Sequence, residues 1–196
     1  MIKIALIRHS ITKGNLEKRY IGITDESLCK VGIDLIKSKS FPLVEAVYCS
    51  PLARCVETAK LIYKDIEPII YKELRECNFG LFENKNYKEL EGNIHYQNWI
   101  DSNGTLNFPE GESPEEFKNR CVKTFDEIIK DILQKNIKSI AMIVHGGTIM
   151  AILDEYSSPH KDFYHWQVNN CEGFIIEIDK NLWRKGDKKV TMKELI

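Results

Sequence analysis

The sequence lacks the features that would assign it to several specialised classes of protein. No apolar run approaches the roughly 20 residues that a membrane-spanning helix needs, so we expect no association with a membrane. Neither sign of charge is in excess, because 28 Lys and Arg residues stand against 29 Asp and Glu residues, giving a net charge of −1. This balance argues against a nucleic-acid-binding protein.

The six cysteines show no pattern of metal or disulfide chemistry. None forms a Cys-x-x-Cys pair, and none is spaced with the histidines as metal ligands would be, so we predict no metal and no cofactor. Four of them lie within apolar patterns and are expected to be buried thiols of a cytoplasmic protein. Nothing at the amino end resembles a signal peptide, since Lys3 and Arg8 interrupt the first apolar residues, and this also favours the cytoplasm.

Repeats, low-complexity tracts and linkers are also missing, so residues 1–196 are expected to form one domain. The hydrophobic content of 43% is enough for a core of that size. Short apolar runs predict buried strands, and helical periodicity occurs between them. The pattern favours an α/β fold of three layers, with a mostly parallel open sheet and helices on both faces. The predicted strands are 2–7, 44–49, 139–144 and 173–178, and an early helix is predicted at 28–37.

The clearest helix signal begins at Ser113. Ser113-Pro114-Glu115-Glu116 is a capping box with proline at the first helical position. Apolar residues then recur at three- and four-residue spacing, as on the buried face of a helix: Phe117, Cys121, Phe125, Ile128, Ile129 and Ile132. Residues 83–111 are instead polar, aromatic and weakly periodic, and we interpret them as a small cap over the carboxyl edge of the sheet. The basic tail from Asp179 is expected to form a solvated edge hairpin.

The first predicted strand ends abruptly on Arg8-His9, which places a cation and an imidazole where the core meets solvent. Ligands bind at the carboxyl ends of strands in open α/β sheets. An arginine beside a histidine at that edge suits an anion, and phosphate is the commonest anion that needs both charge and proton chemistry. An isolated Arg-His pair would more often be an ordinary turn, so this interpretation depends on a second segment of the same kind.

That second segment is Val144-His145-Gly146-Gly147, where another apolar strand ends on a histidine and glycines open a helix. Free backbone N–H groups and the positive end of the helix dipole would lie at this strand tip. A third predicted strand leads into Ser50-Pro51, with Arg54 in the first turns of the following helix. Three strand tips thus offer two imidazoles and two guanidinium groups.

These segments resemble the histidine phosphatase superfamily, also called phosphoglycerate mutase-like. The resemblance is carried in order by four motifs: Arg8-His9 with Thr12 and Asn15, Ser50-Pro51-Leu52-x-Arg54-x-x-x-Thr58-Ala59, Leu74-Arg75-Glu76-x-x-Phe79-Gly80, and Val144-His145-Gly146-Gly147. It extends from residue 3 to about 150 and is specific as a set. Weaker matches are Gly22-x-x-Asp25 and Gly111-Glu112-Ser113.

The resemblance implies a phosphohistidine mechanism. His9 would attack phosphorus as a neutral imidazole, Arg8 and Arg54 would hold the phosphoryl oxygens, and His145 would bind them as an imidazolium. Glu76, rather than Glu73 or Glu83, would be the general acid. Substrate contacts are expected from Asn15, Ser10 and Gly146, while His95, His160 and His165 receive no role. No metal is required, because the arginines supply the positive charge.

The sequence departs from the family pattern at two positions. Ser10 stands where most of the superfamily has glycine after the nucleophile, and its hydroxyl is expected either to be accommodated or to add a phosphate contact. Phe82-Glu83-Asn84 stands where small phosphatases commonly have aromatic-Glu-Gly. Neither change removes the nucleophile or the acid.

The short length and the Phe-Gly-x-Phe-Glu segment are more similar to the α-ribazole phosphatase and broad-specificity phosphatase branch than to the glycolytic mutases. We therefore expect a metal-independent phosphomonoesterase acting on a small phosphorylated metabolite, with α-ribazole 5′-phosphate as one candidate. A phosphoglycerate mutase-type transferase is the closest alternative. The other alternative is a catalytically weak, phosphate-binding regulatory module.

Overall fold

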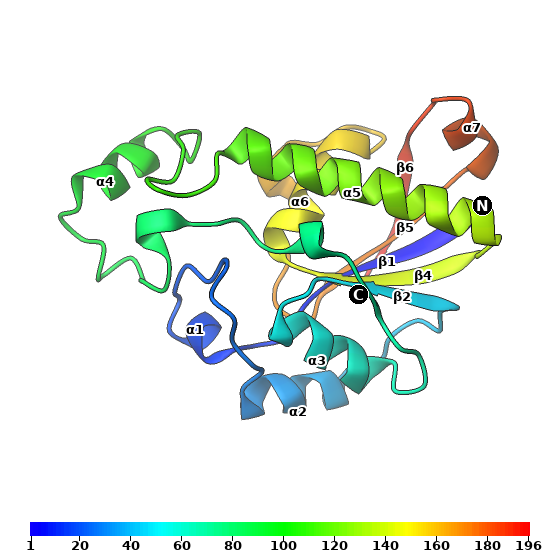
Figure 1. The fold of residues 1–196 in the computed structure, drawn as a ribbon, viewed down its shortest axis with the longest axis horizontal. Coiled ribbons are helices and arrows are strands. Elements are labelled where there is room, and N and C mark those ends of the chain that lie inside the picture. Colours follow the sequence, from blue (N-terminus) through cyan, green and yellow to red (C-terminus); the bar gives the residue numbers. More distant parts are fainter.

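A computed structural model describes all of residues 1–196 and contains a six-stranded sheet in the order β3-β2-β4-β1-β5-β6 (Figure 1). Strands β1, β2, β3 and β4 are parallel, and β5 and β6 continue the sheet in antiparallel pairings. The predicted α/β class with a mostly parallel sheet is therefore confirmed. The strands are β1 (Ile2–Arg8), β2 (Ala46–Cys49), β3 (Ile69–Ile70), β4 (Ser139–Val144), β5 (Gly173–Ile178) and β6 (Val190–Leu195).

Helices cover both faces of this sheet (Figure 1). The α-helices are α1 (Lys13–Leu16), α2 (Lys30–Ser38), α3 (Ala53–Ile62), α4 (Ile94–Asp101), α5 (Pro114–Lys135), α6 (Gly146–Tyr156) and α7 (Lys180–Arg184). Short 3-10 helices occupy Lys72–Leu74, Gly80–Phe82 and Phe163–Trp166. The early helix begins two residues later than its apolar pattern suggested, and the capping box at Ser113 is present as predicted.

Successive side chains of a strand point to opposite faces of the sheet, so a separate core cluster lies on each face. Ile4 and Leu6 of β1 belong to the cluster that packs under α5 and α6, and Ala5 and Ile7 belong to the cluster under α3. All six predicted apolar residues of α5 are buried. Five of the six cysteines are buried and all are free thiols, so the thiols serve as small core residues.

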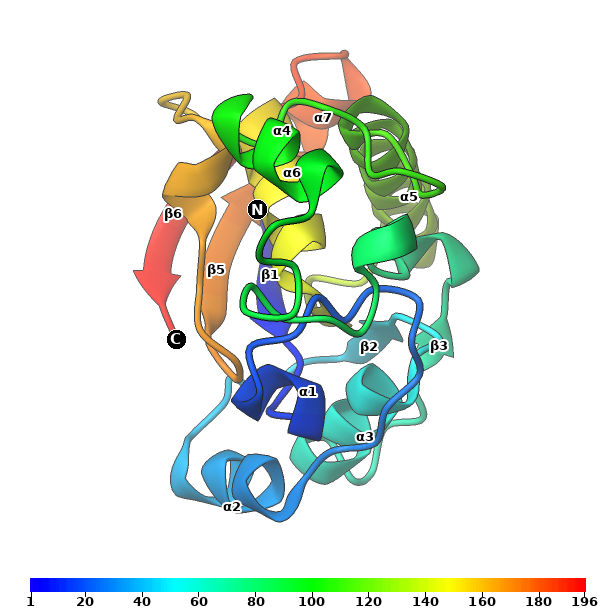
Figure 2. The same ribbon diagram turned by 90° about the vertical axis from the view of Figure 1, so that its left-hand side faces the viewer.

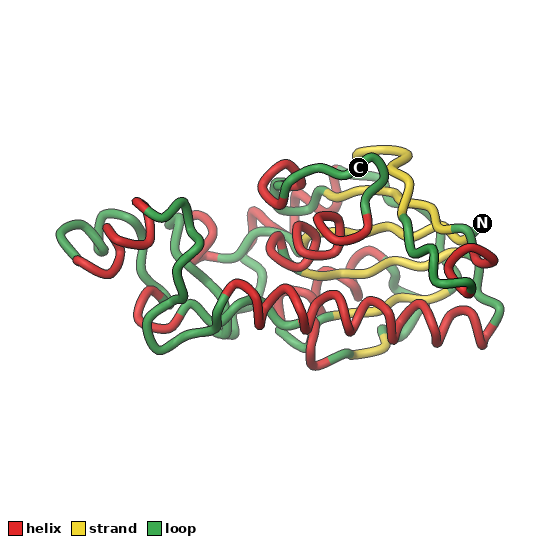
Figure 3. Tube along the Cα trace, turned by 90° about the horizontal axis from the view of Figure 1, so that it is seen from above, coloured by secondary structure: helices red, strands yellow, loops and turns green.

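The segment predicted as a cap lies beyond one end of the sheet, with α4 at the left of Figure 1. Seen from above, this part of the chain is mostly loop (Figure 3), and none of the residues of α4 is buried. Its aromatic side chains instead pack with Phe79 and Phe82, for example Phe108 on Phe79 at 5.0 Å between ring centroids. Parallel strands β1, β2 and β4 carry their carboxyl ends toward this side of the molecule (Figures 1 and 2).

The carboxyl-terminal tail forms an exposed edge strand antiparallel to β5, as the predicted hairpin implies, and a short helix precedes that strand. It contains α7 and returns as β6 along β5. Asp126 of α5 connects the tail to the rest of the protein. Lys188 Nζ of the tail donates to Asp126 Oδ2 at 2.6 Å, and Tyr156 Oη of α6 donates to Asp126 Oδ1 at 3.0 Å. No helix of the structure is both long enough and apolar enough to cross a membrane.

Truncation of Ile129 tests the packing of α5 on the sheet. Ile129 is fully buried in the larger core cluster, so Ile129→Ala should lower the free energy of unfolding by about 2–5 kcal/mol through lost burial and a residual cavity. Chemical denaturation measures this. Leu43→Ala, at a side chain that is 96% exposed, is the control and should change stability by less than about 0.5 kcal/mol. Equal effects of the two substitutions would contradict the packing described.

Candidate active site

Two histidines meet where β1 and β4 end. The parallel register pairs Arg8 with Val144, so the next residue of each strand, His9 and His145, lies at the same edge. His9 N–H donates to the Val144 carbonyl at 2.9 Å, and the two imidazole centroids are 5.1 Å apart at an interplanar angle of 66°. The structure thus brings together the two histidines that the sequence placed at separate strand tips.

His9 is buried and has a defined tautomer. Its Nδ1 lies 2.7 Å from the Ser10 carbonyl oxygen, and because a carbonyl only accepts hydrogen bonds, Nδ1 carries the ring proton. Burial and the Arg54 and Arg8 cations hold the pKa of His9 well below its ordinary value. The neutral ring therefore has its free lone pair on Nε2, as a nucleophile requires.

His145 is fully buried and is held from the side of α3. Its Nε2 lies 2.7 Å from Ser50 Oγ and 3.5 Å from Cys55 Sγ. Burial, with the Arg54 cation next in importance, keeps the pKa of His145 well below its ordinary value. This low pKa favours a neutral ring in the free protein, because burial and the nearby arginines disfavour a further positive charge. The imidazolium expected from the sequence concerns the ring beside a bound phosphate, and it stays a prediction.

Arg8 and Arg54, whose charges act on both histidines, each keep an unpaired N–H donor, and Arg8 lines the cavity whereas Arg54 does not. Arg54 has no exposed surface, and its terminal nitrogens donate to the carbonyls of Thr24 and Gly22, both at 2.8 Å. Arg8 Nη1 donates to the Val168 carbonyl at 2.7 Å. The Nε–H groups of both arginines are buried without a partner. Such unpaired donors are costly unless a ligand accepts from them.

The beginning of α6 completes this positively polarised edge. Gly146 follows His145 and starts the helix, and a Cβ at Gly146 would lie 3.5 Å from Arg8 Nε. The first turn of the helix contains no acidic residue. Unpaired guanidinium N–H groups beside the amino end of a helix make an anion site, and phosphate suits it.

Glu76 reaches the same edge from the loop after Lys72–Leu74. Its carboxylate accepts from the backbone N–H groups of Cys77 at 3.0 Å and Gly147 at 3.3 Å. A Cβ at Gly147 would approach Glu76 Oε1 to 2.6 Å, so glycine is required there for the carboxylate to fit. Burial raises the pKa of Glu76 above its ordinary value, despite the opposing effect of these hydrogen bonds and the arginines.

The two neighbouring glutamates lie elsewhere. Glu73 forms a surface ion pair with Arg75 at 2.6 Å. Glu83 accepts from the backbone N–H groups of Gly22 at 2.7 Å and Thr24 at 2.9 Å, so it organises the loop that Arg54 also contacts. Of the three candidates for a general acid, Glu76 alone lines the cavity.

Comparison with known proteins identifies the group to which this arrangement belongs. The family description "Histidine phosphatase superfamily (branch 1)" matches residues 4–188. The chain belongs to the histidine phosphatase superfamily. This confirms the predicted family and, with it, a phosphatase type of enzyme.

Individual relatives carry several names. A broad-specificity phosphatase of Saccharomyces cerevisiae is 27% identical over 194 residues, covering 92% of this chain and 81% of that protein. The solved structure of an α-ribazole phosphatase from Shigella flexneri has a TM-score of 0.80 at 23% identity, covering 99% of this chain and 96% of that one. A phosphoglycerate mutase structure from Bacillus anthracis has a TM-score of 0.74 at 21% identity, with coverages of 98% and 92%. At these identities the solved structures establish the fold alone.

The two departures from the superfamily pattern have local explanations. Ser10 is fully buried, and its Oγ donates to the Gly32 carbonyl of α2 at 2.8 Å while its N–H donates to Thr58 Oγ1 at 3.0 Å. The hydroxyl is thus accommodated against α2, and Ser10 does not line the cavity, which argues against the alternative that it contacts phosphate. Asn84 has a φ of 58°, a left-handed conformation in which asparagine is the best substitute for glycine.

Asn15 lies in the cavity as predicted, and Asn170 is a contact that the sequence reasoning missed. Asn170 Nδ2 donates to the His9 carbonyl at 3.1 Å and to Asn15 Oδ1 at 3.2 Å. Because Oδ1 of Asn15 also accepts from the Thr12 N–H at 3.1 Å, its amide nitrogen remains available as a donor. No motif in the sequence marked Asn170, since it lies beyond the last family segment.

The cavity at this edge has a volume of about 950 Å³ and extends from the histidines to the cap. One end is formed by Arg8, His9, Glu76 and Gly146. Aromatic rings and neutral amides make up much of the remaining lining. They come from the cap, from the segment before β5 and from the loops that carry Tyr20 and Phe79: Tyr20, Phe79, Trp99, Phe108, Phe163, Tyr164, Asn103, Gln167 and Asn169. The predicted cap therefore forms one wall of the cavity.

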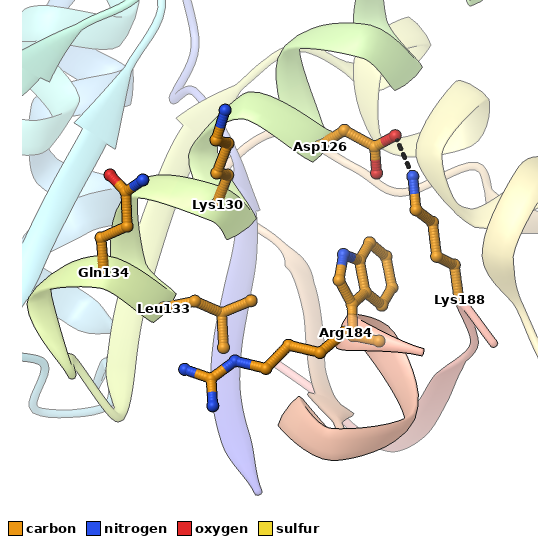
Figure 4. Close-up of a pocket in the computed structure, with 7 residues that line it drawn as sticks. Asp126, Lys130, Leu133, Gln134, Arg184 and Lys188 are labelled. Carbon is orange, nitrogen blue, oxygen red and sulfur yellow. Dashed lines mark hydrogen bonds and ion pairs between the residues drawn. The ribbon is translucent and has the colours of Figure 1, made fainter. Parts of the chain in front are cut away.

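A second pocket, of about 430 Å³, lies between α5 and the tail and contains none of the predicted site residues. Lys188 and Asp126 face each other across it, and the Arg184 guanidinium extends to one side (Figure 4). Its Asp126–Lys188 pair already has the structural role of fastening the tail. No group of three or more His, Cys, Asp or Glu side chains in the structure is arranged to hold a metal ion.

Inorganic phosphate should bind at the histidine edge and raise the melting temperature. A ligand at 100 times its Kd stabilises the folded state by about 2.7 kcal/mol, which thermal denaturation with increasing phosphate would detect. Arg8→Gln removes one of the two unpaired Nε–H donors and should abolish most of this shift. Arg184→Gln, in the second pocket, is the control and should preserve it. If Arg184→Gln abolished the shift and Arg8→Gln preserved it, phosphate would bind in the second pocket and not at the histidine edge.

Proposed function

We propose that this protein is a metal-independent phosphomonoesterase that forms a phosphohistidine on His9 Nε2. The observation that carries the proposal is a neutral His9, with its proton fixed on Nδ1, beside two arginine Nε–H groups that lack partners. A nucleophile and the donors for the phosphoryl oxygens then occupy one edge, and their positive charge balances the charge of the transition state.

The first step transfers the phosphoryl group to the protein. His9 Nε2 forms a bond to phosphorus as the bond from phosphorus to the leaving oxygen breaks. The Arg8 and Arg54 Nε–H groups, the Gly146 N–H and the Asn15 amide donate to the non-bridging oxygens, and Glu76 gives its proton to the leaving alcohol. The raised pKa of Glu76 supports this role, because a protonated carboxyl is needed for it.

The second step regenerates the enzyme. Water attacks the phosphorus of phosphohistidine, the Glu76 carboxylate accepts the proton of that water, and the P–N bond breaks to return the lone pair to Nε2. Inorganic phosphate and an alcohol are the products. His145, neutral in the free protein, donates one N–H to the phosphoryl group in both steps and gains basicity when the phosphate dianion binds beside it.

The outer part of the cavity favours an aromatic, uncharged leaving group over a second anion. Two of its three cations are engaged, since Lys118 pairs with Asp154 at 2.7 Å and Arg19 pairs with Glu17 at 2.6 Å, while Lys18 forms no ion pair. Aromatic rings and amides line the remaining wall. Such a wall suits a phosphorylated riboside with a flat base. α-Ribazole 5′-phosphate, the substrate named for a structural neighbour from Escherichia coli, is a compound of this kind. A mutase would need cations for a carboxylate and a second phosphate.

A panel of phosphate monoesters tests the proposed substrate class. Assayed in EDTA, the protein should release phosphate from α-ribazole 5′-phosphate with a higher kcat/KM than from phosphoserine or 3-phosphoglycerate. Conversion of 3-phosphoglycerate to 2-phosphoglycerate on addition of 2,3-bisphosphoglycerate would instead establish the mutase alternative. Loss of all hydrolysis in EDTA, with recovery on adding a divalent ion, would show that metal independence is wrong.

Substitution of Glu76 tests the general acid. Glu76→Gln should lower kcat/KM for phenethyl phosphate by on the order of 10²-fold and affect p-nitrophenyl phosphate far less, since nitrophenolate leaves without a proton. We compare kcat/KM because it reports only the steps up to the first phosphoryl transfer and not the later hydrolysis of phosphohistidine. Glu73→Gln is the matched control, because Glu73 lies on the surface in an ion pair with Arg75. If Glu73→Gln showed the leaving-group-dependent defect and Glu76→Gln did not, the assignment of Glu76 as the acid would be wrong.

The pH dependence of kcat/KM for phenethyl phosphate should be bell-shaped, with an acid limb set by His9 and a basic limb set by Glu76. His9 must be neutral, and since its pKa lies well below the ordinary value of 6.5, activity is lost only as pH falls through that low value. Glu76 must be protonated, so activity is lost as pH rises through its raised pKa. Glu76→Gln should lack the basic limb. A basic limb unchanged in this variant would contradict the assignment.

A further inference from the structure

A buried ion pair lies directly behind the loop that carries Glu76. Arg120, on α5, and Glu112, just before that helix, are exposed by only 11% and 12%. Arg120 Nε donates to Glu112 Oε1 at 2.6 Å and Nη2 donates to Oε2 at 2.8 Å, which is a bidentate pair. Neither residue lines the cavity.

The other N–H groups of Arg120 bind the main chain of the acid-bearing loop. Nη1 donates to the carbonyls of Glu73 at 2.8 Å and Arg75 at 2.7 Å, and Nη2 donates to the carbonyl of Glu76 itself at 3.0 Å. Together with the two bonds to Glu112, these bonds account for all five donors of the guanidinium. One side chain thus fixes three of the four residues from Glu73 to Glu76.

Glu112 fastens the next part of the same loop. Its N–H donates to the Asn78 carbonyl at 2.9 Å, and its Oε2 accepts from the Asn78 N–H at 3.3 Å. A Cβ at Gly111 would approach that carbonyl to 2.4 Å, so glycine allows the two segments to lie this close. The Gly111-Glu112-Ser113 motif, which had no role in the proposed chemistry, thereby connects α5 to both sides of Glu76.

We propose that Arg120 and Glu112 are positioning residues that hold Glu76 within proton-transfer distance of the leaving oxygen. The inference rests on the proposed function of Glu76 as the acid. Residues 75–79 belong to neither a helix nor a strand, and a catalytic group on a loop needs such external support to stay within reach. Arg120 also lies over the ring of Phe117 at 4.9 Å, which fixes its own orientation.

A purely structural ion pair would behave differently when altered. Its loss would lower the folded fraction and reduce the rates on every substrate by one common factor. A positioning pair affects the step that needs the acid. The ratio of kcat/KM for phenethyl phosphate to kcat/KM for p-nitrophenyl phosphate separates the two, because the concentration of folded enzyme cancels from it.

The experiment measures this ratio in Arg120→Lys and Glu112→Gln. Lysine keeps the charge but cannot reproduce the planar fork, so Arg120→Lys should lower the ratio by about 10- to 100-fold, the loss expected for misplacement by about 1 Å. Glu112→Gln, which can keep one bond to Arg120, should lower the ratio less. Arg75→Gln is the matched control: Arg75 is in the same loop, but its side chain bonds only Glu73 on the surface, and the ratio should not change.

Combination with Glu76→Gln completes the test. If Arg120 acts through Glu76, Arg120→Lys should produce no further fall in the ratio when Glu76→Gln is already present. A reduced ratio in Glu76→Gln with a wild-type ratio in Arg120→Lys would overturn the positioning role alone. An unchanged ratio in Glu76→Gln would overturn the proposed acid, and the positioning role with it.

Discussion

The parallel pairing of β1 with β4 is the constraint on which the site depends. Because Arg8 is in register with Val144, the strands end together and the residues after them are neighbours although 136 positions separate His9 from His145 in the chain. The bond from His9 N–H to the Val144 carbonyl extends this pairing by one residue. A slip of one residue would exchange the side chains that face the two core clusters and separate the imidazoles.

The second constraint is electrostatic. The fully buried Arg54 and the partly buried Arg8 lie beside two imidazoles with few carboxylates nearby, an arrangement that suits an anion better than it suits the folded chain alone. Burial and the arginines lower the pKa of both histidines, so both rings stay neutral in the free protein. Both arginines donate to backbone carbonyls, while the Nε–H group of each stays buried and unpaired. The proposed phosphate supplies the acceptors that the protein lacks.

Much of this could be predicted from the sequence because its signals are local. Apolar runs of six residues ending on Arg8-His9 and before His145 identified two strand tips, and the capping box at Ser113 identified α5. The choice of Glu76 over Glu73 came from family resemblance, and the geometry favours it for a reason that is not local: its carboxylate accepts from the N–H of Gly147.

Other features depend on contacts between distant segments and could not be predicted. The protonation state of His145 follows from burial against Cys55 and Arg54, which belong to α3. Ser10 turns toward Gly32, 22 residues along the chain. Arg120 appears in the sequence as one more cation on an amphipathic helix, and its five bonds become visible only when the loop after β3 is packed against α5.

The most direct measurement of the central claim is to trap the phosphorylated enzyme. Turnover of a ³²P-labelled monoester, quenched within milliseconds and analysed by peptide mapping and phosphorus NMR, reports where the phosphoryl group resides and on which nitrogen. The account predicts acid-labile, alkali-stable phosphate on Nε2 of His9, and none in a folded His9→Ala variant. Phosphate on His145, or steady turnover with no phosphorylated protein at any time, would contradict it.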